Sequence, residues 1–178
     1  MNFKARHCNI KIKYLIYRNY LWLFALLIPI ASAAAIFLYW VRYDWKISFT
    51  IVGGAVSFIY FIQKQQLEET KLFKELFVTF NCSYNDKNEK LNLIKKKPKL
   101  DPPDIAELYD YFNLCSEEYL FYRTGYIYPE VWKAWCNGML DYLKNDEIKN
   151  LWEQEEELSK SYYGLTLSEI KQGSKLKI

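Results

Sequence analysis

Two long runs of apolar residues near the start of the chain dominate its pattern of hydrophobic and polar positions. The first covers residues 20–41, YLWLFALLIPIASAAAIFLYWV, and contains no charged residue. The second covers residues 47–62, ISFTIVGGAVSFIYFI, and is shorter. About 20 apolar residues are enough for a helix to cross the hydrocarbon core of a bilayer. We therefore predict a transmembrane helix in each run, with Trp45 and other flanking residues lengthening the second.

The link between the two runs, residues 42–46, is so short that the two helices must return antiparallel as a hairpin. Aromatic side chains such as Trp40 and Trp45 lie where an interfacial belt is expected. A cleaved signal peptide is a competing interpretation, because the ASA at 31–33 resembles a cleavage site. The apolar residues continue past that point, however, and the second run follows at once.

Basic residues set the predicted orientation of the hairpin. Short loops rich in Lys and Arg stay in the cytoplasm. We therefore predict a multi-pass membrane protein with both termini in the cytoplasm. The outer flanks carry Lys4, Arg6, Lys11, Lys13, Arg18, Lys64, Lys71 and Lys74, whereas the link carries Arg42 and Lys46.

Small residues recur within both predicted membrane helices. Small side chains four residues apart let helix backbones approach closely in lipid, where no hydrophobic drive brings them together. These positions are a predicted packing seam, either inside one hairpin or between the hairpins of a homo-oligomer. The residues are Ala31 and Ala35 in the first helix and Gly53, Gly54 and Ser57 in the second.

Beyond Ile62 the apolar positions keep helical spacing, and neither Gly nor Pro interrupts residues 63–94. We predict that the second membrane helix continues there as a cytoplasmic stalk. Residues 95–178 then form a small cytoplasmic helical domain, so the predicted fold class is all-α. Four helices are expected in it: from Pro102 to a stop at Gly125, from Pro129, from Asp146 to about Leu158, and from Leu167 to Lys171.

Charge differs sharply between the two parts of the chain. Residues 1–62 hold seven Lys and Arg against the single acid Asp44, and the remainder holds 17 basic and 20 acidic residues. A cytoplasmic part so close to neutral does not favour nucleic-acid binding. Its densest basic run, at 95–99, is interpreted as a solvated linker, with contact to anionic lipid or RNA as the alternative.

Few residues offer catalytic or metal-binding chemistry. His7 is the single histidine, and the four cysteines have no metal-ligand spacing. We predict no metal, no cofactor and no enzyme, although Glu117 and Glu118 remain an alternative acid/base pair. A polar cluster for partner binding or structural ion pairing is predicted at Asn113, Glu117, Glu118 and Arg123.

Aromatic and acidic residues are abundant in the predicted domain. Aromatic residues such as Trp132, Trp135 and Trp152 are expected in its core, although so many in a small helical domain can also form a pocket. The acidic run at 153–157 is expected on a solvated helix surface.

Three segments carry a resemblance: residues 72–92, residues 111–139 and the SYYG at 161–164. Together they resemble a recurrent set of uncharacterised bacterial proteins that place a helical domain behind a two-helix membrane hairpin. The architecture is similar to that of membrane effectors of retron-type antiphage systems. The resemblance implies membrane location and antiviral defence, and it supplies no catalytic residues.

Two classes of function follow. In the first, the cytoplasmic domain recognises a protein partner or a nucleoprotein complex, and the hairpins then assemble and compromise the bilayer. In the second, the hairpin is an anchor and the domain is a non-enzymatic scaffold that recruits a cytoplasmic partner to the membrane.

Overall fold

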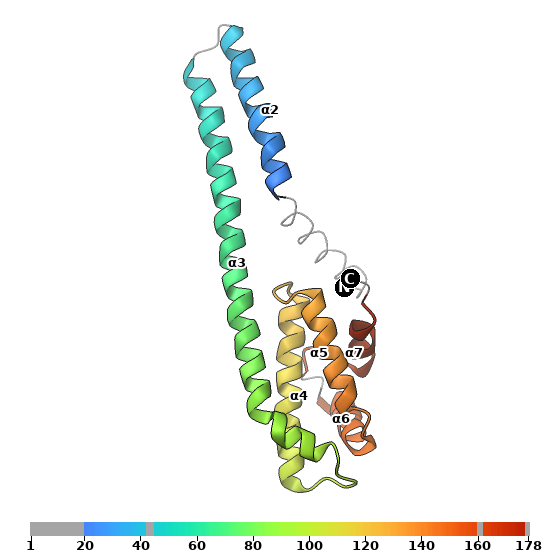
Figure 1. Cartoon of the computed structure of the whole chain (residues 1–178). Coiled ribbons are helices and arrows are strands. Elements are labelled where there is room, and N and C mark those ends of the chain that lie inside the picture. Colours follow the sequence, from blue (N-terminus) through green and yellow to red (C-terminus); the bar gives the residue numbers. More distant parts are fainter. Residues whose placement is uncertain (1–19, 42–44, 160–161, 177–178) are drawn as a thin grey trace. The chain divides into compact units, whose positions relative to one another are not determined.

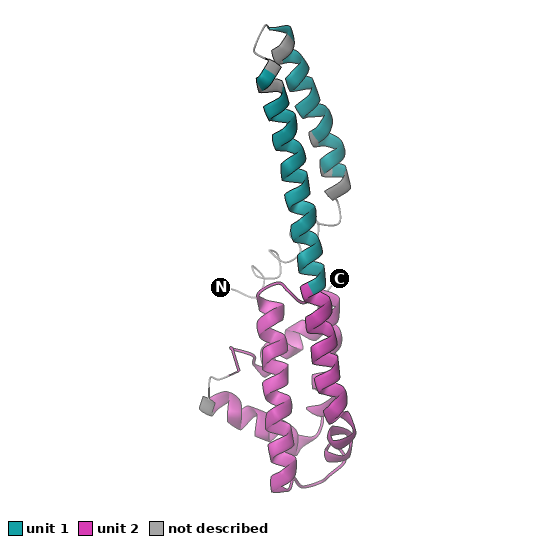
Figure 2. Cartoon of the chain, turned by 90° about the vertical axis from the view of Figure 1, so that its left-hand side faces the viewer, with its two compact units in different colours: residues 1–71 teal, residues 72–178 magenta. Residues whose placement is uncertain are grey.

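The structure is a computed structural model that describes residues 20–41, 45–159 and 162–176. The described residues form α-helices without a strand among them (Figure 1). The helices divide into two compact units, unit 1 (residues 1–71) and unit 2 (residues 72–178) (Figure 2). The predicted all-α fold class is confirmed.

Unit 1 contains α2, Tyr20–Trp40, and the first part of α3, which extends from Trp45 to Ile94. The two helices lie side by side in both views (Figures 1 and 2). Ala35 is buried and Ala31 is half-buried, which identifies the packed face of α2.

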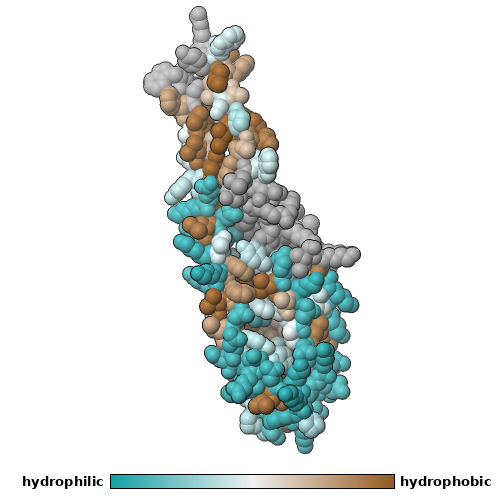
Figure 3. Space-filling view, in the orientation of Figure 1, coloured by the Kyte–Doolittle hydropathy of each residue, from teal (hydrophilic) through white to brown (hydrophobic). Residues whose placement is uncertain are grey.

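Large apolar side chains cover much of the outside of unit 1, where hydrophobic residues gather over α2 and the start of α3 (Figure 3). Trp22 is 76% exposed and Trp40 is 85% exposed. Monomeric soluble proteins rarely expose contiguous apolar patches larger than a few hundred Å². The other exposed residues include Leu26, Ile28, Ile30, Ile36, Phe37, Phe49, Val52, Val56, Phe58 and Phe61.

Across the described ranges, no helix combines the length and the hydropathy expected of a segment that crosses a membrane. The predicted basic segment, residues 1–19, and residues 42–44 of the predicted link lie outside the described residues.

Helix α3 continues without a break from unit 1 into unit 2, as predicted for residues 63–94. Its last part differs from the predicted stalk, because residues 72–94 belong to the compact helical domain. Phe80, Leu91 and Ile94 are buried there. The apolar spacing that predicted a helix also marked a face that packs against other helices. The domain therefore begins at residue 72 rather than at residue 95.

Helix α4, Pro102–Arg123, begins and ends where the sequence predicts. A carboxylate oxygen of Asp104 accepts a hydrogen bond from the backbone N–H of Asp101 at 3.0 Å, which satisfies a free donor at the helix start. At the other end Gly125 has φ of 85°, and the N–H of Tyr126 donates to the carbonyl of Phe121. A glycine in this left-handed conformation closes the helix without steric strain.

Helix α4 is the central helix of unit 2, because three other helices contact it. Its aromatic rings meet rings of α3, α5 and α6 at centroid distances of 6.4 Å (Tyr111–Tyr84), 5.5 Å (Tyr119–Trp132) and 4.8 Å (Phe112–Trp152). One face of α4 buries Leu108, Phe112, Cys115, Tyr119 and Tyr122, and Ile105 is half-buried. Burial extends beyond that face to Tyr111, Leu114, Ser116 and Glu118.

The remaining helices are α5 (Pro129–Tyr142), α6 (Asp146–Ser159) and α7 (Leu167–Ser174), close to their predicted positions. Gly173 of α7 lies directly against α5: an added Cβ would be 2.6 Å from Nε1 of Trp132 and closer still to Sγ of Cys136. The absent side chain at Gly173 therefore lets α7 pack on α5.

We expect Gly173→Ala to destabilise unit 2 by about 1–3 kcal/mol, because Trp132 and Cys136 would have to move. Gly138→Ala is the matched control, since a Cβ at Gly138 meets nothing within 4 Å. It should stabilise α5 by roughly 0.5–1 kcal/mol through helix propensity. Urea unfolding of the full chain measures both changes, and equal stability of the two variants would contradict the close packing.

Candidate functional site

A cavity of about 190 Å³ opens in unit 2 between α3, α4 and α5. Three kinds of side chain surround it: aromatic rings, small residues of α5, and polar groups. Its small residues, Ala134 and Gly138, are exposed, so this side of the cavity faces solvent. The lining residues are Asn81, Tyr84, Tyr111, Glu118, Ala134, Trp135, Gly138 and Met139.

Glu118 is the ionisable residue of greatest interest in this cavity. Its side chain projects from α4, and the residue is only 6% exposed. No hydrogen bond or ion pair to its carboxyl group occurs among the described residues. Burial, together with the nearby charge of Glu117, raises the pKa of Glu118 from 4.5 to about 8. The carboxyl group is therefore mostly neutral at pH 7.

The predicted polar cluster is not brought together. Asn113 and Glu117 are exposed, and they lie on the solvent side of α4. Arg123 pairs with neither glutamate: its guanidinium donates a 2.6 Å hydrogen bond to the carbonyl of Tyr163 and lies over the ring of Tyr119. Of these four residues Glu118 alone is buried, and it lines the cavity together with Trp135 and Met139 of α5.

Two further polar groups of α3 line the cavity. The side-chain amide of Asn81 donates to the carbonyl of Phe77, which leaves its carbonyl oxygen as an acceptor. The hydroxyl of Tyr84 donates to Oδ1 of Asn88 at 3.1 Å. The 2.9 Å contact between the hydroxyls of Tyr84 and Tyr142 is then donated by Tyr142, since Tyr84 has given its one proton to Asn88.

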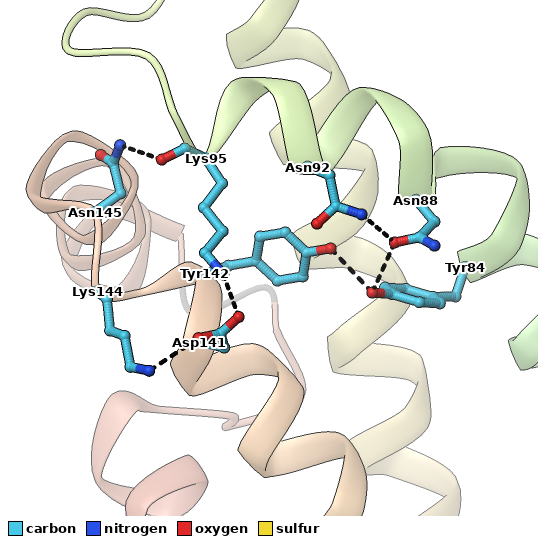
Figure 4. Close-up of polar contacts among 8 residues, drawn as sticks. All are labelled: Tyr84, Asn88, Asn92, Lys95, Asp141, Tyr142, Lys144 and Asn145. Atoms are coloured by element: carbon cyan, nitrogen blue, oxygen red, sulfur yellow. Dashed lines mark hydrogen bonds and ion pairs between the residues drawn. The ribbon is translucent and has the colours of Figure 1, made fainter.

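Beside the cavity, a polar network fastens the end of α3 to α5 and to the start of α6 (Figure 4). The amide of Asn145 donates to the carbonyls of Lys95 and Lys97 at 3.0 Å each. Its carbonyl oxygen accepts from the backbone N–H groups of Glu147 and Ile148 at 2.9 and 3.2 Å. Asn145 therefore caps the start of α6 and the end of α3 with one side chain.

The basic run at 95–99 is partly ion-paired rather than simply solvated. Lys95 pairs with Asp141 of α5, and the pKa of Asp141 is lowered to about 2, chiefly by that hydrogen bond. Lys97 lies 2.7 Å from a carboxylate oxygen of Asp104, and this hydrogen bond lowers the pKa of Asp104. These contacts hold the linker onto the domain.

One glutamate of the acidic run also has a structural partner. Oε2 of Glu156 accepts a 2.9 Å hydrogen bond from the N–H of Leu167, and it also accepts from the indole of Trp152 at 3.3 Å. Glu156 thus helps to start α7, whereas Glu153 and Glu157 are exposed as predicted.

The cysteines of unit 2 do not supply an activated nucleophile. Cys115 and Cys136 are buried and unbridged, and burial raises the pKa of each thiol. Thiols that stay protonated are poor nucleophiles. Among the described residues, no cluster of His, Cys, Asp and Glu could hold a metal ion.

The predicted packing seam divides into two groups. Ala35 is buried and Ala31 half-buried, as expected for packing inside the hairpin. Gly53, Gly54 and Ser57 are exposed, and a Cβ at either glycine meets nothing within 4 Å. The small face of α3 is therefore open.

We expect the stability of unit 2 to fall as the pH rises from about 4.5 to about 8. The folded state holds a proton on Glu118 in this range that the unfolded state has released, so each rise in pH favours unfolding. Glu118→Gln should remove this part of the pH dependence. Urea unfolding at a series of pH values measures it, and an unchanged profile in Glu118→Gln would contradict the perturbed carboxyl group.

We also expect Asn145→Ala to destabilise unit 2 by about 1–3 kcal/mol, because two carbonyls and two N–H groups lose their partner. Asn145→Asp is the informative control, since it keeps the acceptor for α6 and loses the donor to α3. It should have intermediate stability in thermal unfolding. Wild-type stability of Asn145→Ala would show that water replaces all four bonds.

Comparison with known proteins finds no family model, no curated protein and no solved structure that matches the chain. The resemblance of residues 72–92 and 111–139 to bacterial hairpin proteins therefore stays a prediction. Functional proposals for this protein rest on its own sequence and geometry.

Proposed function

We propose that this chain is a membrane-anchored helical effector that perturbs the bacterial inner membrane when its cytoplasmic domain is triggered. The role belongs to antiphage defence of the retron or abortive-infection type, and this last step rests on the resemblance of architecture alone. The trigger is a protein partner or a nucleoprotein complex bound by unit 2. The proposed activity is not enzymatic.

The apolar exterior of unit 1 is the observation that carries the proposal. Helix α2 has 21 residues without a charge, and exposed tryptophans lie near both of its ends, at Trp22 and Trp40. Aromatic rings at both ends of an apolar helix suit the two interfaces of a bilayer. The segment also contains Leu21, Leu23, Leu27 and Leu38, whose side chains lie outside the described part.

The open small face of α3 supports assembly of several hairpins. Gly53 and Ser57 are one helical turn apart, so they share a face on which another helix backbone can approach closely. The surroundings of Gly53 and Gly54 are empty in a single chain. A second copy of the hairpin would fill that space, and association of uncharged hairpins can disturb lipid packing.

A non-enzymatic anchor or scaffold is the alternative. It uses the same apolar exterior, but it requires neither assembly nor damage to the membrane. The effector requires the open face of Gly53 and Gly54 to bind another hairpin, whereas the anchor does not.

We expect Gly53→Leu to abolish depolarisation and growth arrest while the protein still reaches the membrane. The added side chain has room within one chain but blocks close approach of another helix. Val52→Leu is the matched control, because Val52 is exposed, is rotated about 100° around α3 from Gly53 and already carries a branched side chain. Membrane potential and growth are measured after induced expression, with and without neighbouring genes and phage challenge.

Intact membrane potential under every condition would exclude the effector and leave the anchored scaffold. Recovery of the protein in the soluble fraction would exclude both the membrane effector and the membrane-anchored scaffold. Equal toxicity of Gly53→Leu and wild type would exclude assembly through this face.

A further inference from the structure

We propose that the cavity between α3, α4 and α5 binds a compact organic cation, an ammonium or guanidinium group, which pairs with the carboxylate of Glu118. This site is independent of the proposed membrane function. It follows from the chemistry of the cavity walls in unit 2.

Glu118 places a carboxyl group at the cavity. The residue is more than nine-tenths buried and lines the cavity, yet no described residue gives it a hydrogen bond or an ion pair. Its oxygens are not among the fully enclosed polar atoms of the described residues, so they face the open space of the cavity. A carboxyl group held this way can pair with a group that comes from outside the chain.

The polar groups at the cavity include two acceptors. The side-chain carbonyl of Asn81 accepts hydrogen bonds, and the carboxyl of Glu118 becomes a full acceptor when it loses its proton. The amide of Asn81 donates one of its two N–H groups to the carbonyl of Phe77. The hydroxyl of Tyr84 is already engaged with Asn88 and Tyr142. A ligand that offers several N–H donors, such as an ammonium or a guanidinium, complements this set.

The walls of the cavity are rich in aromatic residues. Trp135, Tyr84 and Tyr111 line it, and the faces of aromatic rings attract cations. Among the residues that the structure describes, no Lys or Arg lines it. A cation entering the cavity therefore meets a carboxylate and aromatic rings without a competing positive charge.

The titratable groups that face Glu118 reinforce this charge balance. They are Tyr111, Cys115 and Glu117 on α4, Cys136 on α5 and Tyr84 on α3, and all of them are neutral or acidic. Ionisation of Glu118 would therefore become favourable when an external cation arrives.

The size of the cavity limits the ligand to a small group. About 190 Å³ is less than the roughly 300–1,000 Å³ of pockets that enclose a drug-sized molecule. One end of a free diamine or one basic side chain of a partner protein is of suitable size. Both sources present the same cationic group, and it would enter over Ala134 and Gly138.

The proposal is tested by calorimetric titration of the full chain in detergent micelles at pH 7. The probes are 1,4-diaminobutane, 1-amino-4-guanidinobutane and the neutral 1,4-butanediol. We expect the two cations to bind and the diol not to bind. Binding should release close to one proton, detected by comparing buffers of different ionisation enthalpy, because Glu118 gives up its proton to pair with the cation.

Two variants locate the site. Glu118→Gln should weaken cation binding at least tenfold and remove the proton release. Gly138→Leu fills the mouth of the cavity without touching the acidic group, and should weaken binding similarly, since a Cβ there meets nothing within 4 Å. Asn137→Leu places the same side chain one residue away, at an exposed position outside the lining, and should bind like wild type.

A peptide that contains a single arginine distinguishes the two sources of the cation. Tighter binding of the peptide than of 1-amino-4-guanidinobutane assigns the site to a partner side chain, and tighter binding of the small molecule assigns it to a free amine. Absence of binding by every cationic probe would overturn the proposal. Binding that is equal for the diol, or that survives both Glu118→Gln and Gly138→Leu, would overturn it as well.

Discussion

Burial of α4 on several sides is the constraint on which unit 2 depends. Because three helices contact it, α4 keeps only a narrow exposed stripe that includes Asn113 and Glu117, and its aromatic and aliphatic residues pack against the three neighbours. Tyr111, Phe112 and Tyr119 meet α3, α6 and α5 respectively. The arrangement also explains why a carboxylic acid, Glu118, is enclosed: the packing of α3 and α5 on α4 covers its position except at the cavity that opens beside it.

The helices of unit 2 could be predicted closely from local signals. Pro102, Gly125 and Pro129 act through their own backbone preferences, which do not depend on distant parts of the chain. The limits of the domain could not be predicted in the same way. An apolar face along residues 72–94 is equally compatible with a free stalk and with a packed helix, and only the partner helices decide between them.

The cavity was harder to predict than the helices for a related reason. Glu117 and Glu118 are adjacent and chemically identical, and a helical pattern alone does not say which of them the neighbouring helix covers. Asn81, Tyr84 and Trp135 come from two other helices and meet Glu118 only in the folded domain. The abundance of aromatic residues was the one signal in the sequence that pointed toward a pocket.

Asn145 bears on how the domain holds together over time. Its hydrogen bond to the carbonyl of Lys95 joins positions 50 residues apart, and the same side chain starts α6. Helix ends ordinarily fray one by one, each within its own last turn. Here the turn that follows α3 and the first turn of α6 share one side chain, so the opening of either one removes a partner from the other. The two ends therefore form a single cooperative unit, and protection of their amide protons from solvent exchange is gained and lost together.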